Sequence, residues 1–220
     1  MATSRIKNHA GRLRRYWKQR GTLATLRFVA SRLFRFEKHM VYETTADTHR
    51  GAVRWGADEQ VLQFGPENFD YGLTPELRAY LGGEQAVESL QAVRDGDRLF
   101  VITRGGEFVH RGYIVFKTRQ SRLLGDDEAS PLIAFCSTSP KARGRGIYRR
   151  ALETEVMYLF GHGYQRVLIE TDPQNYASRK GIEAAGFTFA WEARVWIWLN
   201  WFVIRRNRSS DGVQWRVLTV

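Results

Sequence analysis

The feature that most constrains this chain is a stretch rich in glycine and arginine, PKARGRGIYRRAL, over residues 140–152. Gly144 and Gly146 allow the backbone to bend and to approach a ligand closely. The residues that follow read as the start of a helix, where unpaired N–H groups and the helix dipole favour an anion. Positive charge around this loop comes from Arg143, Arg145, Arg149 and Arg150. The stretch therefore predicts a phosphate-binding loop, although the usual P-loop ending, Gly-Lys-Ser/Thr, is absent.

The segments on either side of the loop predict strands and helices in a regular order. The apolar run PLIAFCSTS, residues 131–139, reads as a strand before the loop, and residues 147–160 read as the helix after it. RVLIETDPQN, residues 166–175, reads as a second short strand that leads into a helix over residues 176–185. Asn175 suits the N-cap of that helix and Gly186 suits its C-terminal cap. This order predicts a parallel crossover between two central strands.

Three motifs in this region resemble the GCN5-related N-acetyltransferase (GNAT) family. They are Arg143-x-x-Gly146, Asn175-x-x-Ser178 and Gly186-Phe187. The resemblance covers residues 132–187, and residues 39–220 follow the family's order of elements. It implies a mixed α/β fold, a central mixed sheet with flanking helices, and acetyl-CoA or another acyl-CoA with its pyrophosphate on the loop. Tyr148 replaces the family's last Gly/Ala, so it either covers the coenzyme arm and narrows the acyl channel or belongs to the core.

The resemblance also implies which residues bind the coenzyme. Main-chain N–H groups of the strand before the loop would hold the pantetheine arm and polarise the thioester carbonyl. Asn175 would both cap its helix and contact the coenzyme arm, and Ser178 would contact it through its hydroxyl. The expected coenzyme-binding residues are Phe135, Cys136, Ser137, Arg143, Gly144, Arg145, Gly146, Ile147, Tyr148, Arg149, Asn175 and Ser178.

Glu170 is the candidate catalytic base, because it resembles the glutamate of ribosomal-protein alanine acetyltransferases and would remove the ammonium proton through a water. Alternatively it is an exposed carboxylate at the strand end or the partner of an arginine; Asp172 and Glu43 are weaker substitutes. Ile182 occupies the position of the tyrosine that serves as general acid in those enzymes. A thiol leaves fairly well as thiolate near neutral pH, so activity does not require that tyrosine.

Other side chains carry weaker hypotheses. Tyr176 and Tyr42 are alternative proton donors, although packing explains each more simply. Cys136, the single cysteine, excludes an internal disulfide and has no histidine patterned beside it, which favours direct transfer over a covalent step. His162 reads as a helix-terminal residue. No metal-binding cluster is visible.

Charge is concentrated at the N-terminus. Residues 1–38 hold eleven Lys and Arg and one acid, Glu37, whereas the whole chain has a net charge of +11. Two apolar stripes at helical spacing predict basic amphipathic helices: Ile6, Ala10, Leu13 and Trp17, then Leu26, Val29, Ala30, Leu33 and Phe36. This extension either docks on the protein's own sheet, binds an anionic membrane surface or is a removed targeting segment. Nucleic acid is not favoured, since no binding module accompanies the charge.

The remaining segments predict one domain over residues 39–220. They suggest a first strand from His39, helices over residues 74–81 and 84–93, and a hairpin turning at Gly105-Gly106. A long strand is expected from Thr188 to about Ile204, followed by a hairpin that turns at NRSSDG. Its most apolar part, residues 195–204, is too short to span a membrane as a helix and reads as a buried strand.

The sequence thus predicts a cytoplasmic N-acyltransferase, peripheral at the membrane if the extension binds lipid. The expected acceptor is the primary amine of a small molecule, first an amino sugar of surface-polysaccharide synthesis. The alternative is a non-catalytic protein with the GNAT fold, recruited to partners or to anionic membrane by its basic N-terminus.

Overall fold

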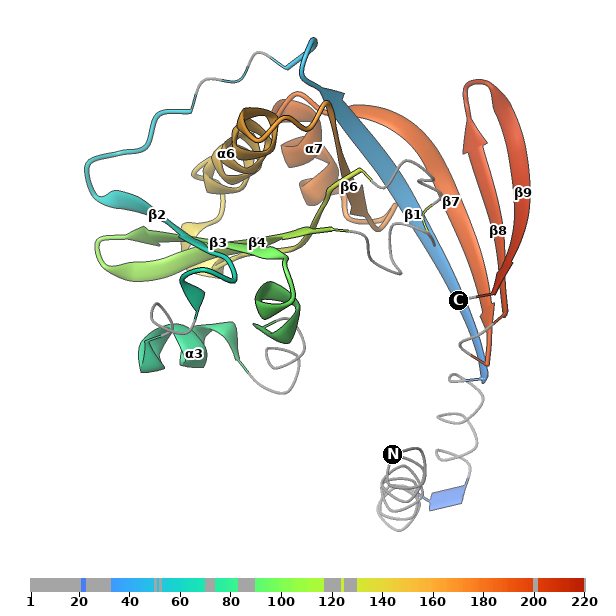
Figure 1. The fold of residues 1–220 in the computed structure, drawn as a ribbon, viewed down its shortest axis with the longest axis horizontal. Coiled ribbons are helices and arrows are strands. Elements are labelled where there is room, and N and C mark those ends of the chain that lie inside the picture. The colour runs from blue at the N-terminus through green and yellow to red at the C-terminus, as the bar shows by residue number, and fades with distance from the viewer. Residues whose placement is uncertain are drawn as a thin grey trace.

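The computed structural model describes residues 21–22, 33–49, 51, 53–69, 74–82, 90–116, 124, 130–199 and 202–219. The amphipathic helices expected before Leu33 lie outside these residues. The described chain forms a nine-stranded sheet with the order β2-β3-β4-β5-β6-β1-β7-β8-β9 (Figure 1). Its strands are β1 (Phe34–Thr45), β2 (Glu59–Phe64), β3 (Arg98–Arg104), β4 (Glu107–Val115), β5 (Leu132–Thr138), β6 (Arg166–Thr171), β7 (Thr188–Trp198), β8 (Phe202–Ser209) and β9 (Gly212–Thr219).

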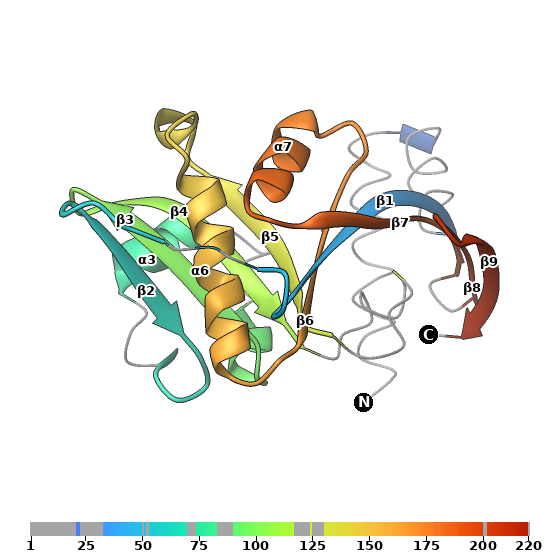
Figure 2. The same ribbon diagram turned by 90° about the horizontal axis from the view of Figure 1, so that it is seen from above.

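The sheet is mixed, as expected. β5 and β6 pair in parallel and are joined through α6 (Ile147–Gly161), which confirms the predicted crossover. The other neighbouring strands pair antiparallel. α6 and α7 (Tyr176–Ala184) cover one face, whereas α3 (Pro75–Leu81) covers the other (Figures 1 and 2).

Alternation along the strands builds a core on each face of the sheet. On one side Ile133 and Ile169 pack with Leu152 and Val156 of α6. On the other side Leu132, Leu168 and neighbouring side chains pack with the helical residues Leu77 and Leu81. Burial of these side chains at roughly 1.5–3 kcal/mol each fixes both helices on the sheet and thereby holds the crossover in place.

Several local predictions are confirmed. Gly105 and Gly106 form the turn between β3 and β4 with φ of 55° and 80°, which favours glycine. α3 begins after Thr74, whose hydroxyl accepts a hydrogen bond from the N–H of Leu77. In the second expected helix, the described residues 90–94 are helical. The turn at NRSSDG joins β8 to β9.

Three predictions need correction. β1 begins at Phe34, so Phe36 lies in a strand rather than on a helical stripe, and the expected boundary after residue 38 falls inside β1. The single strand expected from Thr188 to Ile204 is two strands, β7 and β8; β7 ends before Leu199, a turn residue whose φ is 53°. β2 was not expected from the sequence.

Among the described residues, no helix has the length and apolar character needed to cross a bilayer.

Candidate active site

The site forms where two neighbouring strands diverge. β5 and β6 pair only at Leu132 with Leu168 and at Ile133 with Ile169. Beyond these pairs, the two strands and the loop after β5 line a cavity of about 640 Å³. It is lined by Glu170 and by every expected coenzyme-binding residue except Arg145, namely Phe135, Cys136, Ser137, Arg143, Gly144, Gly146, Ile147, Tyr148, Arg149, Asn175 and Ser178.

Phe135 marks the point at which β5 leaves β6. Its φ of 54° lies in the left-handed region, which costs a non-glycine residue roughly 1–2 kcal/mol. The pairing of β5 with β4 is also irregular here, with a register shift between Arg111 and Tyr113. The Phe135 ring meets Tyr113 edge-on at 6.1 Å between centroids. The strain thus coincides with the cavity, where backbone groups of β5 are released from strand pairing.

The loop after β5 leaves the N-terminus of α6 available to an anion. Gly144 and Gly146 have φ of 74° and 71°, which favours glycine at both positions. Gly146 is the N-cap of α6, so no side chain caps the first turn, and this turn contains no acidic residue. The first N–H groups of a helix have no partner within it, and the helix dipole adds positive potential at the same place. The α6 N-terminus therefore suits phosphate oxygens.

The four arginines around the loop have different surroundings. Arg143 lines the cavity and donates from Nε to the carbonyl of Thr138 at 3.2 Å. Arg149 also lines it and forms an ion pair with Glu153 at 2.8 Å. Arg145 lines a neighbouring hollow of about 360 Å³. Two of the arginines thus contribute charge to the cavity directly.

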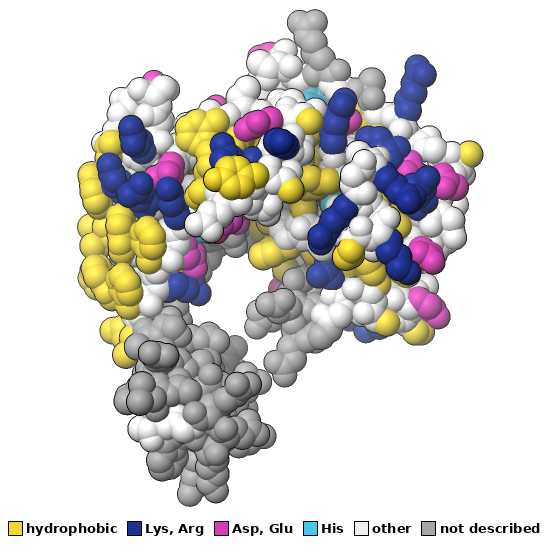
Figure 3. Space-filling view, turned by 180° about the vertical axis from the view of Figure 1, so that it is seen from behind, with side chains coloured by type: hydrophobic (Ala, Val, Ile, Leu, Met, Phe, Trp, Pro, Cys, Tyr) yellow, Lys and Arg dark blue, Asp and Glu magenta, His cyan; other side chains and the backbone are white. Residues whose placement is uncertain are grey.

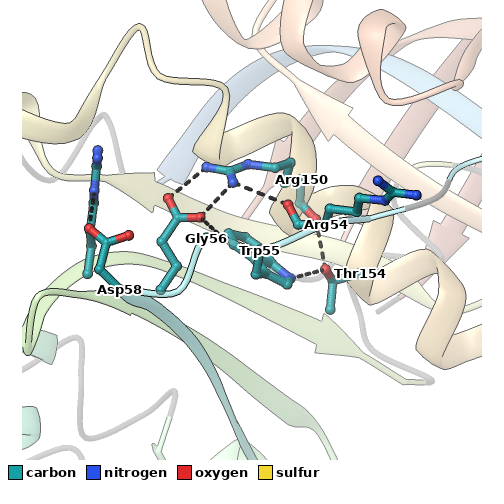
Figure 4. Close-up of polar contacts among 8 residues, drawn as sticks. Arg54, Trp55, Gly56, Asp58, Arg150 and Thr154 are labelled. Atoms are coloured by element: carbon teal, nitrogen blue, oxygen red, sulfur yellow. Dashed lines mark hydrogen bonds and ion pairs between the residues drawn. The ribbon is translucent and has the colours of Figure 1, made fainter.

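Arg150 does not add charge to the loop, contrary to the prediction from sequence. Its guanidinium donates to both carboxylate oxygens of Glu59, at 2.6 and 2.8 Å, and lies over the ring of Trp55 (Figure 4). The indole N–H of Trp55 in turn donates to Thr154 on the same helix. Arg150 therefore fastens α6 to the segment that leads into β2.

Tyr148 links α6 to α7 at the cavity. Its hydroxyl lies 3.0 Å from Oγ of Ser178. A Cβ atom at Gly181 would lie 2.5 Å from Cδ1 of Tyr148, so the ring packs directly on the helix backbone. Burial, and next the neighbouring Cys136, raise the pKa of Tyr148 far above its usual range, which keeps the phenol protonated. Asn175 Oδ1 accepts from the N–H of Ser178 at 3.1 Å, so the N-cap prediction holds.

Glu170 is held by a histidine from β1. Oε2 of Glu170 lies 2.6 Å from Nδ1 of His39, and Nε2 of His39 lies 3.3 Å from Glu37. Burial by itself lowers the pKa of His39, but the hydrogen bonds to Glu170 and Glu37 outweigh it and raise the pKa to about 9. His39 is therefore an imidazolium at neutral pH. His39 is thus a partner of Glu170, from a strand that the sequence had not linked to it.

Comparison with known proteins identifies the family. Residues 65–187 match the acetyltransferase (GNAT) family. The chain belongs to this family. GNAT members are N-acetyltransferases that use acetyl-CoA or another acyl-CoA.

Two solved structures show the same fold. A GNAT acetyltransferase from Colwellia psychrerythraea has a TM-score of 0.50 and 18% identity, covering 73% of this chain and 55% of that chain. A Drosophila protein has a TM-score of 0.52 and 14% identity, covering 80% of this chain and 57% of that chain. This chain thus spans little more than half the length of either. No curated protein sequence matches it.

The other candidate acids and bases in this GNAT chain have structural roles. Glu43 forms an ion pair with Arg166 at 2.7 Å, and Asp172 accepts from the N–H of Gln174. Tyr42 is fully buried and donates to Glu183, whereas Tyr176 is 67% exposed and does not line the cavity. Ile182 is buried in the core. As expected, His162 caps the end of α6, and its Nδ1 lies 2.7 Å from the Tyr158 carbonyl.

Cys136 of the cavity lining and Glu155 of α6 both have a raised pKa. Burial, then the charges of Glu155 and Glu170, raise the pKa of the Cys136 thiol well above its usual value, so it stays protonated near neutral pH. Glu155 is fully buried, and neither of its carboxylate oxygens has a hydrogen-bond partner in the described part of the chain. Burial raises the pKa of Glu155 to about 8. The sequence showed Glu155 only as a polar residue within a helix.

Proposed function

We propose that this chain is an acyl-CoA-dependent N-acyltransferase that transfers an acetyl group to a primary amine of a small molecule. The observation that carries the proposal is that one cavity is lined both by the uncapped N-terminus of α6 and by Glu170. The helix N-terminus suits the anionic end of a coenzyme, and the carboxylate suits a proton that must leave an amine.

The residues around the loop fit a diphosphate. Gly146 places no side chain at the helix start, no acid occupies the first turn, and Arg143 and Arg149 line the cavity. Hydrogen bonds from main-chain N–H groups to a charged acceptor are roughly twice as strong as neutral ones. When bound, the coenzyme supplies a thioester, whose sulfur leaves without a strong acid. Main-chain groups of Phe135, Cys136 and Ser137 would hold the arm next to this thioester.

Glu170 takes the role of general base in this mechanism. An ammonium group has no free electron pair, so it must lose a proton before its nitrogen forms a bond to the carbonyl carbon. Glu170 accepts this proton through a water, and the His39 imidazolium holds the carboxylate in one orientation. The bound thioester would supply the acyl carbon, and its C–S bond would break as the C–N bond forms. The second proton of the amine nitrogen would then pass to the departing thiolate, to which the protonated phenol of Tyr148 would donate a hydrogen bond.

Direct transfer is favoured over a step through Cys136. A protonated thiol is a poor nucleophile, and burial keeps the Cys136 proton in place. In this mechanism Cys136 contributes its main chain and packing, and the amine reacts with the thioester itself.

The first candidate acceptor is an amino sugar of the kind used in surface-polysaccharide synthesis. The Ile147-Tyr148 end of the loop and the Asn175-x-x-Ser178 pattern resemble GNAT members of that kind. Hydroxyl side chains of Ser137, Thr138 and Thr171 also line the cavity. Hydroxyl groups donate and accept hydrogen bonds, which matches the hydroxyls of a sugar.

The alternative is a non-catalytic GNAT-fold protein that is recruited to partners or to an anionic membrane by its basic N-terminus. Two observations favour it: Ile182 replaces the expected tyrosine, and the carboxylate of Glu170 is engaged by His39. Titration with acetyl-CoA and longer acyl-CoAs, followed by thiol release with amino sugars, polyamines, lysine peptides and peptide N-termini, separates the two. Thiol release that requires an amino sugar supports the proposal. Coenzyme binding without thiol release across this panel supports the alternative, and the absence of coenzyme binding contradicts the proposed enzyme.

A further inference from the structure

The half of the sheet formed by β1, β7, β8 and β9 exposes aromatic side chains in rows. Strand register places Phe34, Trp198 and Phe202 in one row. The next row holds Phe36, Trp196, Ile204 and Val217. Phe36 and Trp196 are in ring contact at 5.2 Å, and Trp196 stacks on Trp215 at 5.9 Å. We call these two rows, with Trp215, the aromatic face.

The aromatic face is exposed in a way that core residues are not. The exposed fractions are 43% for Phe34, 53% for Phe202 and 61% for Trp215. Side chains on the opposite face of the same strands, such as Val195 and Val203, are completely buried. The alternation therefore places the apolar residues of one face in the core and those of the other in solvent.

A row of cations borders the aromatic face. Lys38, Arg194 and Arg206 lie in register on β1, β7 and β8, in the same row as Trp215. Glu192 pairs with both Lys38 and Arg194, while the guanidinium of Arg206 lies 5.6 Å from the Trp215 ring centroid. The exposed Arg208 follows in the next row. Since successive rows on one face are two residues apart, they are separated by ~7 Å.

The apolar character increases toward the tip of the sheet. Leu33 and Leu199 form this tip, where the N–H of Leu199 donates to the carbonyl of Leu33 at 2.8 Å. They are 46% and 64% exposed. Moving from the tip toward the middle of the sheet, the surface therefore presents first the two leucines, then the two apolar rows and then the row of cations. Figure 3 shows the hydrophobic side chains gathered at this end of the sheet, with Lys and Arg beside them.

We propose that the aromatic face docks on the surface of an anionic lipid bilayer, tip first. A protein group lying in the membrane interface buries its apolar side ~5–10 Å deep, which matches one to two rows of this face. Trp combines an apolar ring with a polar N–H and suits the interface, and the cationic row then lies at the depth of lipid phosphates. This role is independent of the proposed acyl transfer.

The sequence that precedes the sheet is strongly basic. Residues 1–32 contain nine Lys and Arg and no Asp or Glu, and they join the sheet at Leu33, the tip itself. Each basic residue near an anionic surface strengthens the attraction to it. The binding partner of this face must therefore offer an apolar surface together with negative charge.

Charge argues against two other occupants, and the arrangement of the apolar rows argues against a third. A second copy, or the chain's own basic segment, would bring cations toward cations, which is unfavourable for association. A single-stranded nucleic acid binds where aromatic platforms and cations follow one groove. Here the apolar rows and leucines extend beyond the cations, and a phosphate backbone leaves that apolar tip uncovered.

Binding of the full chain to phosphatidylcholine vesicles with and without phosphatidylglycerol, by co-sedimentation, tests the proposal. Phe34→Ser/Phe202→Ser is expected to weaken binding to anionic vesicles at least ~10-fold, because two exposed rings are lost from the apolar rows. Arg206→Gln/Arg208→Gln is expected to weaken it ~10-fold, and added salt should weaken the wild type similarly. The matched control is Met157→Ser/Phe189→Ser, which removes two equally exposed hydrophobic side chains outside the face and should leave binding unchanged.

A second measurement needs no disruptive variant. Lipids with brominated chains should quench the tryptophan emission of the wild type, and less so in Trp198→Phe/Trp215→Phe, which keeps the rings. Equal binding of the wild type to neutral and anionic vesicles would overturn the proposal. So would full binding by both Phe34→Ser/Phe202→Ser and Arg206→Gln/Arg208→Gln. So would a wild type that ignores vesicles but sediments as a dimer that Phe34→Ser/Phe202→Ser converts to a monomer, or one that binds only oligonucleotides.

Discussion

Nδ1 of His39 lies 2.6 Å from Oε2 of Glu170, although 131 residues separate the two in sequence. The register of β1 against β6, with Val41 opposite Glu170, brings them together. The carboxylate that lines the cavity is thereby held by a cation that is itself bound to Glu37. In the proposed mechanism, a carboxylate held in one orientation needs little reorganisation when an amine binds. Positioning of this kind lowers the activation barrier of a reaction.

Replacing Glu170 by glutamine should lower acyl transfer by ~10²- to 10⁴-fold, because the amide accepts no proton. Acetyl-CoA affinity should change little, since the proposed anion seat is at the loop and α6. Thiol-release kinetics and calorimetric titration measure the two quantities. Asp47→Asn, in an exposed turn, is the matched control and should behave as the wild type. A Glu170→Gln enzyme of nearly full activity would remove Glu170 from the mechanism.

The His39 cation should make stability depend on pH. Its pKa is raised from 6.5 to about 9 in the folded chain, so its contribution is complete below pH 6.5 and is lost as the pH rises through 9. The free energy of unfolding in urea should fall over this range, and His39→Gln should reduce the fall. His162→Gln, at the exposed end of α6, is the control. An unchanged pH profile in His39→Gln would contradict a charged His39.

Glu155 should add a second pH dependence at lower pH. The folded chain holds a proton on Glu155 up to about pH 8, whereas the unfolded chain loses it near 4.5, so stability falls as pH rises across this window. Glu155→Gln keeps the shape without the charge and should flatten the profile, raising stability at pH 8 by on the order of a few kcal/mol. The exposed Glu107→Gln serves as control. A profile as steep as that of the wild type would show that Glu155 is ionised when folded.

Because Tyr148 packs on Gly181, replacing this glycine by alanine should lower the free energy of unfolding, although alanine is normally favourable within a helix. Gly→Ala within a helix normally gains up to ~1 kcal/mol, but the new Cβ would lie 2.5 Å from the Tyr148 ring. Gly181→Ala should therefore destabilise by roughly 1–3 kcal/mol, and less when combined with Tyr148→Ala. Gly161→Ala, with open space around its Cβ, is the matched control and should be neutral or stabilising. Chemical unfolding of Gly181→Ala, Tyr148→Ala, their combination and Gly161→Ala tests this, and a stabilising Gly181→Ala would refute the close packing.

Asn175 combines a structural role with a proposed one at the coenzyme. Asn175→Ala should cost ~1 kcal/mol through the lost cap, whereas Asn175→Asp keeps the capping oxygen and should cost little. If Asn175 also contacts the coenzyme arm, both variants should bind acetyl-CoA more weakly when folded. Unfolding curves and titrations at a temperature where each variant is folded separate these effects. Unchanged affinity in both variants would leave the cap as the whole role of Asn175.

Local signals accounted for the central part of the fold. The crossover from β5 through α6 to β6, the glycines at 144 and 146 and the Asn175 cap follow from rules that act within a few residues. These elements also position most of the cavity lining, whose residues were expected from the resemblance to the GNAT family over residues 132–187.

The remaining differences arise where a local pattern is ambiguous or a partner is distant. Leu33 and Phe36 fit a helical spacing, while Phe34 and Phe36 fit strand alternation, and pairing with β7 decides between them. The end of β7 was not predicted because apolar residues continue on both sides of Leu199 in the sequence, where the outward rows of β7 and β8 are exposed aromatics. His39 was not assigned to Glu170 because the pairing of β1 with β6 is set by the whole sheet.

The place of β1 between β6 and β7 has a consequence for how the molecule assembles. During synthesis β1 finds its two neighbours only after residues 166–198 have been made. Sheets built from such distant pairings fold slowly, because the intervening chain loses conformational entropy before the stabilising contacts form. Until then Phe34, Phe36 and Val41 lack their neighbouring strands, so nascent chains truncated before β7 should depend on chaperones to stay out of aggregates.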